Sequence, residues 1–160
     1  IRVHGQEKRY IHEVMGINGR LDNIQAAVLT VRIKRLQDWI TDRIRIAKKY
    51  CEELKTIGEI TVPQTKNNCK HVFNQFTVRI NKKRDIFQNR LNESGVPTAV
   101  HYPIPLHLQP AFKYLGYSKN DFPVSEKISE EVISLPIFPG MTEQQQSFVI
   151  DSIKKTVKTL

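Results

Sequence analysis

The clearest pattern of hydrophobic and polar positions runs through residues 22–57. Apolar side chains recur there at spacings of three and four, as on one face of a helix, at Leu29, Ile33, Leu36, Ile40, Ile44, Ala47, Cys51 and Leu54. Asp22 and Gln25 have the spacing of a capping box, and Gly58 is placed to end the helix. The pattern therefore predicts one long helix over residues 22–57.

The start of this helix carries a second set of apolar positions, at Ile24, Ala27, Val28 and Val31. These positions widen the apolar surface, so we expect the first turns to be buried on more than one side. Such burial is typical of a helix that bridges two domains or lies in a dimer interface. Without those partners, the isolated chain is expected to cover this surface by self-association or to leave residues 1–25 disordered.

Two further segments have the composition of β-strands. Residues 72–80 are rich in β-branched and aromatic side chains, and Phe76, Val78 and Ile80 alternate with polar positions, which predicts a strand with one buried face. Residues 96–100 are expected to form a second short strand. The later stretch SLPIFP is expected to be extended.

Three more helices are predicted after residue 58. The first covers residues 84–94, and the last begins with a capping box formed by Thr142 and Gln145. Between them, Ser125 is expected to cap a helix that carries Ile128, Val132 and Ile133. A long helix followed by a small sheet packed with helices is an α+β architecture.

The chain is basic, with 25 Lys and Arg against 16 Asp and Glu and a formal net charge of +9. An excess of this size favours an anionic partner, such as nucleic acid, a phosphorylated small molecule or an acidic protein. The basic residues are spread over several helices, however, in groups such as Arg43, Arg45, Lys48 and Lys49, and a solvated helix face is the favoured explanation of each group. Aromatic side chains are only weakly interleaved with the basic ones, which argues against a nucleic-acid partner.

Motifs of a self-contained active site are absent from the sequence. It contains no Walker loop, GxGxxG, HExxH or GxSxG. His101 and His107 match no common zinc spacing, so no metal site is expected. Cys51 and Cys69 are read as reduced thiols. No apolar run approaches the roughly 20 residues that span a bilayer.

Two segments nevertheless have residues suited to ligand binding. In GINGR, two glycines flank Asn18, which can donate hydrogen bonds to an oxyanion, and Arg20, which can pair with a phosphate or carboxylate. In HYPIPLHLQP, three prolines exclude a helix and stiffen the loop, so that His101, Tyr102 and His107 can be held in fixed orientations. Each segment also has a purely structural explanation: GINGR could be a tight turn, and HYPIPLHLQP could be a rigid surface connection.

The segments GINGRLDNIQAAVL, RLQDW, HYPIPLHLQPAF and DFPVSEKISEEVISLPIFPGMTEQQ occur in this order along the chain. Together they resemble the DegT/DnrJ/StrS family of nucleotide-sugar aminotransferases, which are pyridoxal-phosphate enzymes of fold type I, the aspartate aminotransferase fold. The resemblance implies that the chain is the carboxy-terminal part of such an enzyme. Residues 1–21 would end the arm of the large domain, residues 22–57 would form the connecting helix, and residues 58–160 the small domain.

The resemblance also implies roles for the two binding segments. The family forms cytoplasmic homodimers with active sites at the subunit interface. Asn18 matches an asparagine that reaches the cofactor phosphate of the partner subunit, and Arg20 lies near the substrate in the same motif. His101, Tyr102 and His107 match a loop that borders the site of the nucleotide-diphosphate sugar.

The catalytic lysine of the family lies upstream of the matched region, so this chain is expected to contain no catalytic residue. The 160 residues alone are therefore expected neither to bind pyridoxal phosphate tightly nor to transaminate. The intact enzyme would use glutamate to aminate a keto-sugar nucleotide. Two other readings stay open: a sugar dehydratase of the same family, and an independent basic module that binds nucleic acid or an acidic partner.

Overall fold

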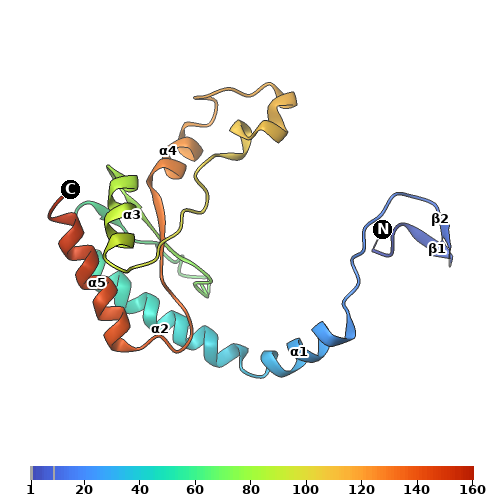
Figure 1. Ribbon diagram of the computed structural model, residues 1–160, viewed down its shortest axis with the longest axis horizontal. Helices are drawn as coiled ribbons and strands as arrows, with labels where there is room; N and C mark the ends of the chain where they lie inside the picture. The colour runs from blue at the N-terminus through green and yellow to red at the C-terminus, as the bar shows by residue number, and fades with distance from the viewer. Residues whose placement is uncertain (1, 9) are drawn as a thin grey trace. The chain divides into compact units, whose positions relative to one another are not determined.

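The computed structural model describes residues 2–8 and 10–160. It divides into two compact units, one that ends at Asp38 and one that spans Trp39–Leu160 (Figure 1). Secondary structure in the first unit consists of an antiparallel pair of short strands, β1 (Gln6–Lys8) and β2 (Ile11–His12), and then the helix α1 (Asn23–Ile33).

Helix α1 has no buried residue, and Ile24 is 81% exposed. The apolar surface that the sequence predicted at this position is therefore open in the described chain. The Asp22 side chain makes no capping hydrogen bond to α1, so the predicted capping box is not formed there.

The sequence predicted one continuous helix over residues 22–57, but the structure has two. Helix α1 ends at Ile33, and α2 (Leu36–Leu54) begins after a turn. In that turn the Arg35 N–H donates to the carbonyl oxygen of Arg32, at 3.0 Å, three residues back rather than four. The tighter turn interrupts the helical ladder and separates the exposed α1 from the partly buried α2.

The second unit is built on a three-stranded antiparallel sheet in the order β3-β4-β5. Its strands are β3 (Ile60–Thr61), β4 (Phe76–Ile80) and β5 (Val132–Leu135). In β4 the buried positions are Phe76, Val78 and Ile80, as the alternating sequence predicted. The strand starts later than predicted because Phe73 has a positive φ of 48°, which is incompatible with an extended strand.

Three helices complete the core around this sheet: α2, α3 (Arg84–Glu93) and α5 (Glu143–Val157). They bury apolar side chains together with the strands, the largest being Tyr50, Phe76, Phe87, Ile46 and Leu54. Tyr50 also donates a hydrogen bond from its hydroxyl to the Pro136 carbonyl oxygen, at 2.9 Å. The α+β architecture expected from the sequence is confirmed.

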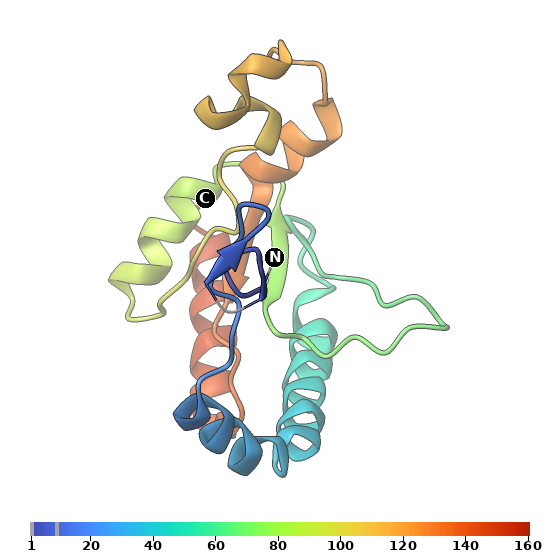
Figure 2. The same cartoon turned by 90° about the vertical axis from the view of Figure 1, so that its right-hand side faces the viewer.

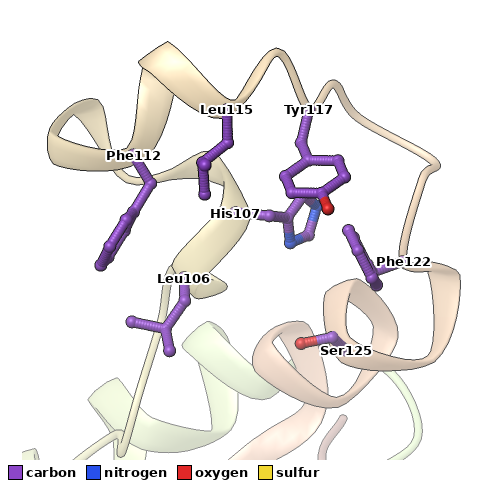
Figure 3. A pocket seen from close by; sticks show the side chains of 7 residues that line it. All are labelled: Leu106, His107, Phe112, Leu115, Tyr117, Phe122 and Ser125. Atoms are coloured by element: carbon purple, nitrogen blue, oxygen red, sulfur yellow. The ribbon is translucent and has the colours of Figure 1, made fainter.

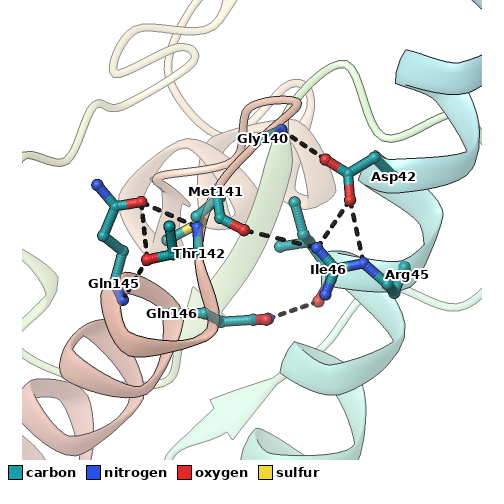
Figure 4. A network of polar contacts seen from close by, with 8 residues as sticks. All are labelled: Asp42, Arg45, Ile46, Gly140, Met141, Thr142, Gln145 and Gln146. Carbon is teal, nitrogen blue, oxygen red and sulfur yellow. Dashed lines mark hydrogen bonds and ion pairs between the residues drawn. The ribbon is translucent and has the colours of Figure 1, made fainter.

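A network of polar contacts fastens α5 and the turn before it to α2 (Figure 4). Asp42 of α2 accepts a hydrogen bond from the Gly140 N–H at 2.5 Å, and Gln146 of α5 donates to the Ile46 carbonyl oxygen at 2.8 Å. The predicted capping box of Thr142 and Gln145 is present at the start of α5. It satisfies backbone N–H groups that a free helix end would leave without partners.

Residues 101–122, which we call the lobe, project beyond one end of the sheet (Figure 2). The lobe contains two short 3-10 helices, η1 (Leu106–Leu108) and η2 (Pro110–Leu115), and it leads into α4 (Pro123–Glu131). The prediction that prolines exclude helix here was therefore too strict, because proline is tolerated in the first turn of a helix and Pro110 starts η2. The core cluster contains no residue of the lobe.

Two other predictions around the lobe were wrong. Residues 96–100 form only one isolated bridge, between Ala99 and Ser134, because Pro97 has no N–H to donate to a ladder. Helix α4 begins at Pro123, not after Ser125, and the backbone becomes extended at Val132. Val132 and Ile133 therefore lie in β5, where β-branched residues pack well in a pleated strand.

Candidate functional site

The GINGR segment lies in the first unit and brings its two predicted binding residues together. Asn18 pairs with Val3 in an isolated bridge, and Arg20 Nε donates to Asn18 Oδ1 at 3.2 Å. The Gly19 N–H donates to the Arg2 carbonyl oxygen at 2.7 Å. A Cβ on Gly19 would come within 3.1 Å of Arg2, so glycine permits this close approach.

This arrangement leaves hydrogen-bond donors available. Asn18 Oδ1 is occupied by Arg20, so the free part of the amide is its Nδ2 group, which can only donate. Both side chains are exposed. An amide and a guanidinium that present donors side by side are suited to an anionic oxygen of a phosphate or carboxylate.

His101 and Tyr102 lie in the second unit, where the chain leaves the sheet for the lobe. Their rings are 5.6 Å apart and nearly perpendicular. His101 Nδ1 is 3.0 Å from Ser134 Oγ of β5, whereas Tyr102 is 73% exposed. The strand therefore anchors the histidine ring, and the tyrosine beside it faces outward.

His101 lines two cavities. One, of about 400 Å³, lies between the start of the lobe and α4 and includes Tyr102, Gln109 and Ser129 in its wall. The other, of about 290 Å³, lies against the ends of β4 and β5. His101 is thus the residue that forms a wall shared by the two cavities.

Arg43 of α2 holds the second cavity in shape. Its Nη1 atom donates to the carbonyl oxygens of Phe73, Asn74 and Ile137 at 3.3, 3.1 and 3.0 Å. Asn74 and Ile137 both line that cavity. The sequence grouped Arg43 with solvated basic residues, and no local pattern indicates its role, because its partners are backbone atoms far away in the chain.

His107 occupies a different environment from the other two predicted loop residues. Its side chain is only 8% exposed, its Nε2 lies 3.0 Å from Glu126 Oε1, and its ring packs 4.8 Å from that of Phe122. It lines a third cavity of about 390 Å³ with mostly apolar walls, in which Tyr117 and Phe122 flank the imidazole (Figure 3). The structure therefore brings His101 and Tyr102 together and places His107 inside the lobe.

Glu126 is the partner that orders this part of the lobe. Burial raises the pKa of its carboxyl group, but hydrogen bonds from the Asn120 N–H, from His107 and from the Phe122 N–H outweigh burial, and the net pKa lies below its usual value. The charged carboxylate is therefore the form that the lobe stabilises. Glu126 was not predicted from the sequence, because nothing in its spacing from His107 links the two.

The lysines show no feature of a catalytic amine. In the part of the chain that the structure describes, no lysine side chain is buried, and Lys154 is paired with Glu53 at 2.7 Å. Among the same residues, no group of His, Cys, Asp or Glu is arranged so that it could hold a metal ion. None of the described helices has both the length and the hydrophobicity of a membrane span.

Comparison with known proteins gives consistent matches over nearly the whole chain. A model of the DegT/DnrJ/EryC1/StrS aminotransferase family matches residues 1–154. The pleiotropic regulatory protein of Geobacillus stearothermophilus is 44% identical over 155 residues, which are 96% of this chain and 41% of that protein. The dTDP-3-amino-3,6-dideoxy-alpha-D-galactopyranose transaminase of Aneurinibacillus thermoaerophilus is 37% identical over 97% of this chain and 42% of its own length.

Solved structures give matches to the same family of aminotransferases. The crystal structure of S. venezuelae DesV in complex with a ketimine intermediate matches with a TM-score of 0.90 at 34% identity, covering 99% of this chain and 43% of DesV. The chain therefore spans less than half the length of each of these three proteins.

Proposed function

The chain belongs to the DegT/DnrJ/EryC1/StrS aminotransferase family, and from this membership we propose that it is the carboxy-terminal portion of an enzyme that aminates a keto-sugar nucleotide. The observation that carries the proposal is the match over residues 1–154, with relatives that include a named transaminase of a dTDP-amino sugar. Like that relative, the intact protein would take a nucleotide-diphosphate sugar as its substrate.

Pyridoxal phosphate is the cofactor that this family implies, and it supplies the group that carries the amino function between donor and acceptor. The residues of this chain fit its phosphate but not its aldehyde. Asn18 and Arg20 present donors suited to a phosphate oxygen, whereas no described lysine is buried, as a lysine activated by loss of hydration would be. We therefore expect the cofactor to bind only when the lysine-bearing remainder of the enzyme is present.

The substrate would be held by the residues around the shared cavity wall. Within the described residues, His101 Nε2 makes no hydrogen bond, and the exposed Tyr102 hydroxyl can both donate and accept. These groups are suited to the diphosphate and hydroxyl oxygens of a sugar nucleotide. The formal charge of +9 favours approach of such an anion.

Homodimer formation is part of the same proposal. The exposed apolar side chains of α1 need a cover, and the rest of the enzyme or a second subunit would supply it. Glutamate as the amino donor, residence in the cytoplasm, and inactivity of the 160 residues alone follow from the family resemblance and are proposed with it.

The test compares the full-length product of the natural reading frame with the 160-residue chain. We expect the full-length protein to turn yellow with pyridoxal phosphate and to aminate a dTDP-keto-hexose with glutamate, and the chain alone to do neither. In the full-length protein, His101→Ala should raise KM for the sugar nucleotide, with Ser147→Ala as a matched control on α5. A full-length protein that binds no pyridoxal phosphate would refute the proposal, and loss of water without amination would identify a dehydratase.

A further inference from the structure

A row of three polar side chains runs from the sheet to the wall shared by the two cavities. Thr77 Oγ1 of β4 lies 2.8 Å from Ser134 Oγ of β5, and Ser134 Oγ lies 3.0 Å from His101 Nδ1. Thr77 and Ser134 are directly paired in the β4–β5 register. The row therefore rests on two hydrogen-bonded strands rather than on a loop.

Ser134 is the fixed centre of this row. It is only 7% exposed, and its backbone both donates to and accepts from Ala99, at 2.7 and 3.3 Å. Ala99 lies two residues before His101. The same bridge therefore holds the chain that carries the imidazole and the hydroxyl that contacts it.

The number of hydroxyl protons and acceptors indicates which group donates in each of the two hydrogen bonds. If Thr77 donates to Ser134, the Ser134 hydroxyl is free to donate to His101 Nδ1, and every hydroxyl proton has an acceptor. In the reverse direction His101 Nδ1–H donates to Ser134 and Ser134 donates to Thr77. The half-exposed Thr77 hydroxyl would then have to donate to solvent, because residues 2–8 and 10–160 offer it no acceptor besides Ser134 Oγ. Only in the first direction is each hydroxyl proton bonded within the protein.

We propose that Ser134, aided by Thr77, is a positioning residue that holds His101 as the neutral tautomer with its proton on Nε2. Nδ1 is then the acceptor on the protein side, and Nε2–H is a fixed donor on the side of the cavities. That the ligand is an anionic oxygen, such as a diphosphate oxygen, rests on the proposed function. A neutral imidazole with Nε2–H binds such an oxygen without first taking up a proton, whereas the other tautomer presents a lone pair that repels it.

The tautomer is measured directly on the 160-residue chain by long-range ¹H–¹⁵N correlation spectra of its five histidines, with His101→Gln to assign the signals. We expect wild-type His101 to show a protonated Nε2 and an Nδ1 that accepts a hydrogen bond. Ser134→Ala should shift the Nδ1 signal to that of an unbonded nitrogen, Ser134→Thr should restore it, and the control Ser147→Ala should leave it unchanged. A wild-type spectrum with the proton on Nδ1 overturns the proposal.

Thr77→Val provides an independent check that does not depend on how well Ser134 variants fold. In the proposed direction Ser134 still donates to Nδ1, so the tautomer stays the same. In the reverse direction Ser134 loses the one acceptor that the described residues offer its proton, and it turns that proton toward His101, so the tautomer changes. A change of tautomer in Thr77→Val therefore contradicts the proposal, and an unchanged one supports it.

The ligand is tested separately by titrating the same variants with inorganic pyrophosphate and following the His101 signals. Loss of one oriented donor to an anion should weaken pyrophosphate binding about tenfold in Ser134→Ala but not in Ser147→Ala. Equal affinities in these two variants overturn the positioning role. If wild type has the Nε2–H tautomer but no pyrophosphate perturbs it, the tautomer assignment is supported and the anionic ligand, with this part of the proposed function, is refuted.

Discussion

Replacing Asp42 should lower the stability of the second unit by an amount that its contacts allow us to work out. One carboxylate oxygen accepts from the Gly140 N–H at 2.5 Å, and the other accepts from Arg45 Nη2 and Nε at 2.7 and 3.0 Å. A hydrogen bond to a charged group contributes about 1.5–3 kcal/mol. Gly140 is exposed, so water replaces part of the lost bond and the lower end of that range applies. The half-exposed Arg45 pair adds about 0.3–0.5 kcal/mol.

Asp42→Ala should therefore cost about 2 kcal/mol, and Asp42→Asn, which keeps an acceptor for Gly140 but not the charge, about half of that. Urea unfolding followed by the fluorescence of Trp39, the single tryptophan, measures both. With an unfolding slope of about 2 kcal/mol per molar urea, Asp42→Ala should shift the midpoint by about 1 M. Asp151→Ala, an exposed aspartate on α5, is the control and should stay within about 0.5 kcal/mol of wild type.

The loss should also depend on pH with a definite sign. The Gly140 N–H and then Arg45 hold the pKa of Asp42 below its usual value. The contribution of the charge is therefore complete above the unfolded pKa of about 3.9 and is lost as the pH falls through the lower folded value. The difference between wild type and Asp42→Ala should be largest at pH 7 and should shrink in acid to about half, the part that a neutral acceptor for Gly140 retains. Equal stability at pH 7, or a difference that persists unchanged in acid, would refute the reasoning.

Three further outcomes are expected. Thr142→Ala removes the capping box of α5 and should cost about 1 kcal/mol in the same urea assay, and an unchanged midpoint would contradict this. Ile24→Asp should shift the isolated chain toward monomer in sedimentation velocity while Gln25→Asp does not; identical sedimentation would argue against α1 as a contact surface. The pKa of Glu126 is lowered in the folded lobe, so the hydrogen bonds that its carboxylate accepts are weakened as the pH falls through that pKa. Amide exchange in residues 118–122 should therefore accelerate in wild type over this pH range, and Glu126→Gln should show no such step.

The parts of the fold that follow from local pattern were predicted well. The alternation in β4 and the capping box of α5 are encoded by residues within a few positions of one another, so the sequence alone reveals them. The break at residues 34–35 was missed because the apolar spacing continues across it. Periodicity gives the face of a helix, but it does not report where a backbone hydrogen bond changes from four residues back to three.

The site was predicted only as far as residue type allows. Residue types that are suited to binding anions stand out in GINGR and HYPIPLHLQP, and the structure places Asn18 beside Arg20 and His101 beside Tyr102. The residues that hold these side chains in place cannot be recognised from the sequence. Ser134 lies 33 positions from His101, and such pairings are created by sheet register rather than by sequence neighbours.

The lobe adds no side chain to the central core, and this separation has a consequence for how such proteins change over time. Mutations between residues 101 and 122 can reshape the surface of the lobe while leaving most of the free energy of folding untouched. In the proposed enzyme, where this loop borders the substrate, selection could therefore explore new substrates without first finding compensating changes elsewhere. A fold in which the core and a surface segment are separate in this way is well suited to diversification. Residues 101–122 are therefore a segment that protein engineers can exchange as a unit.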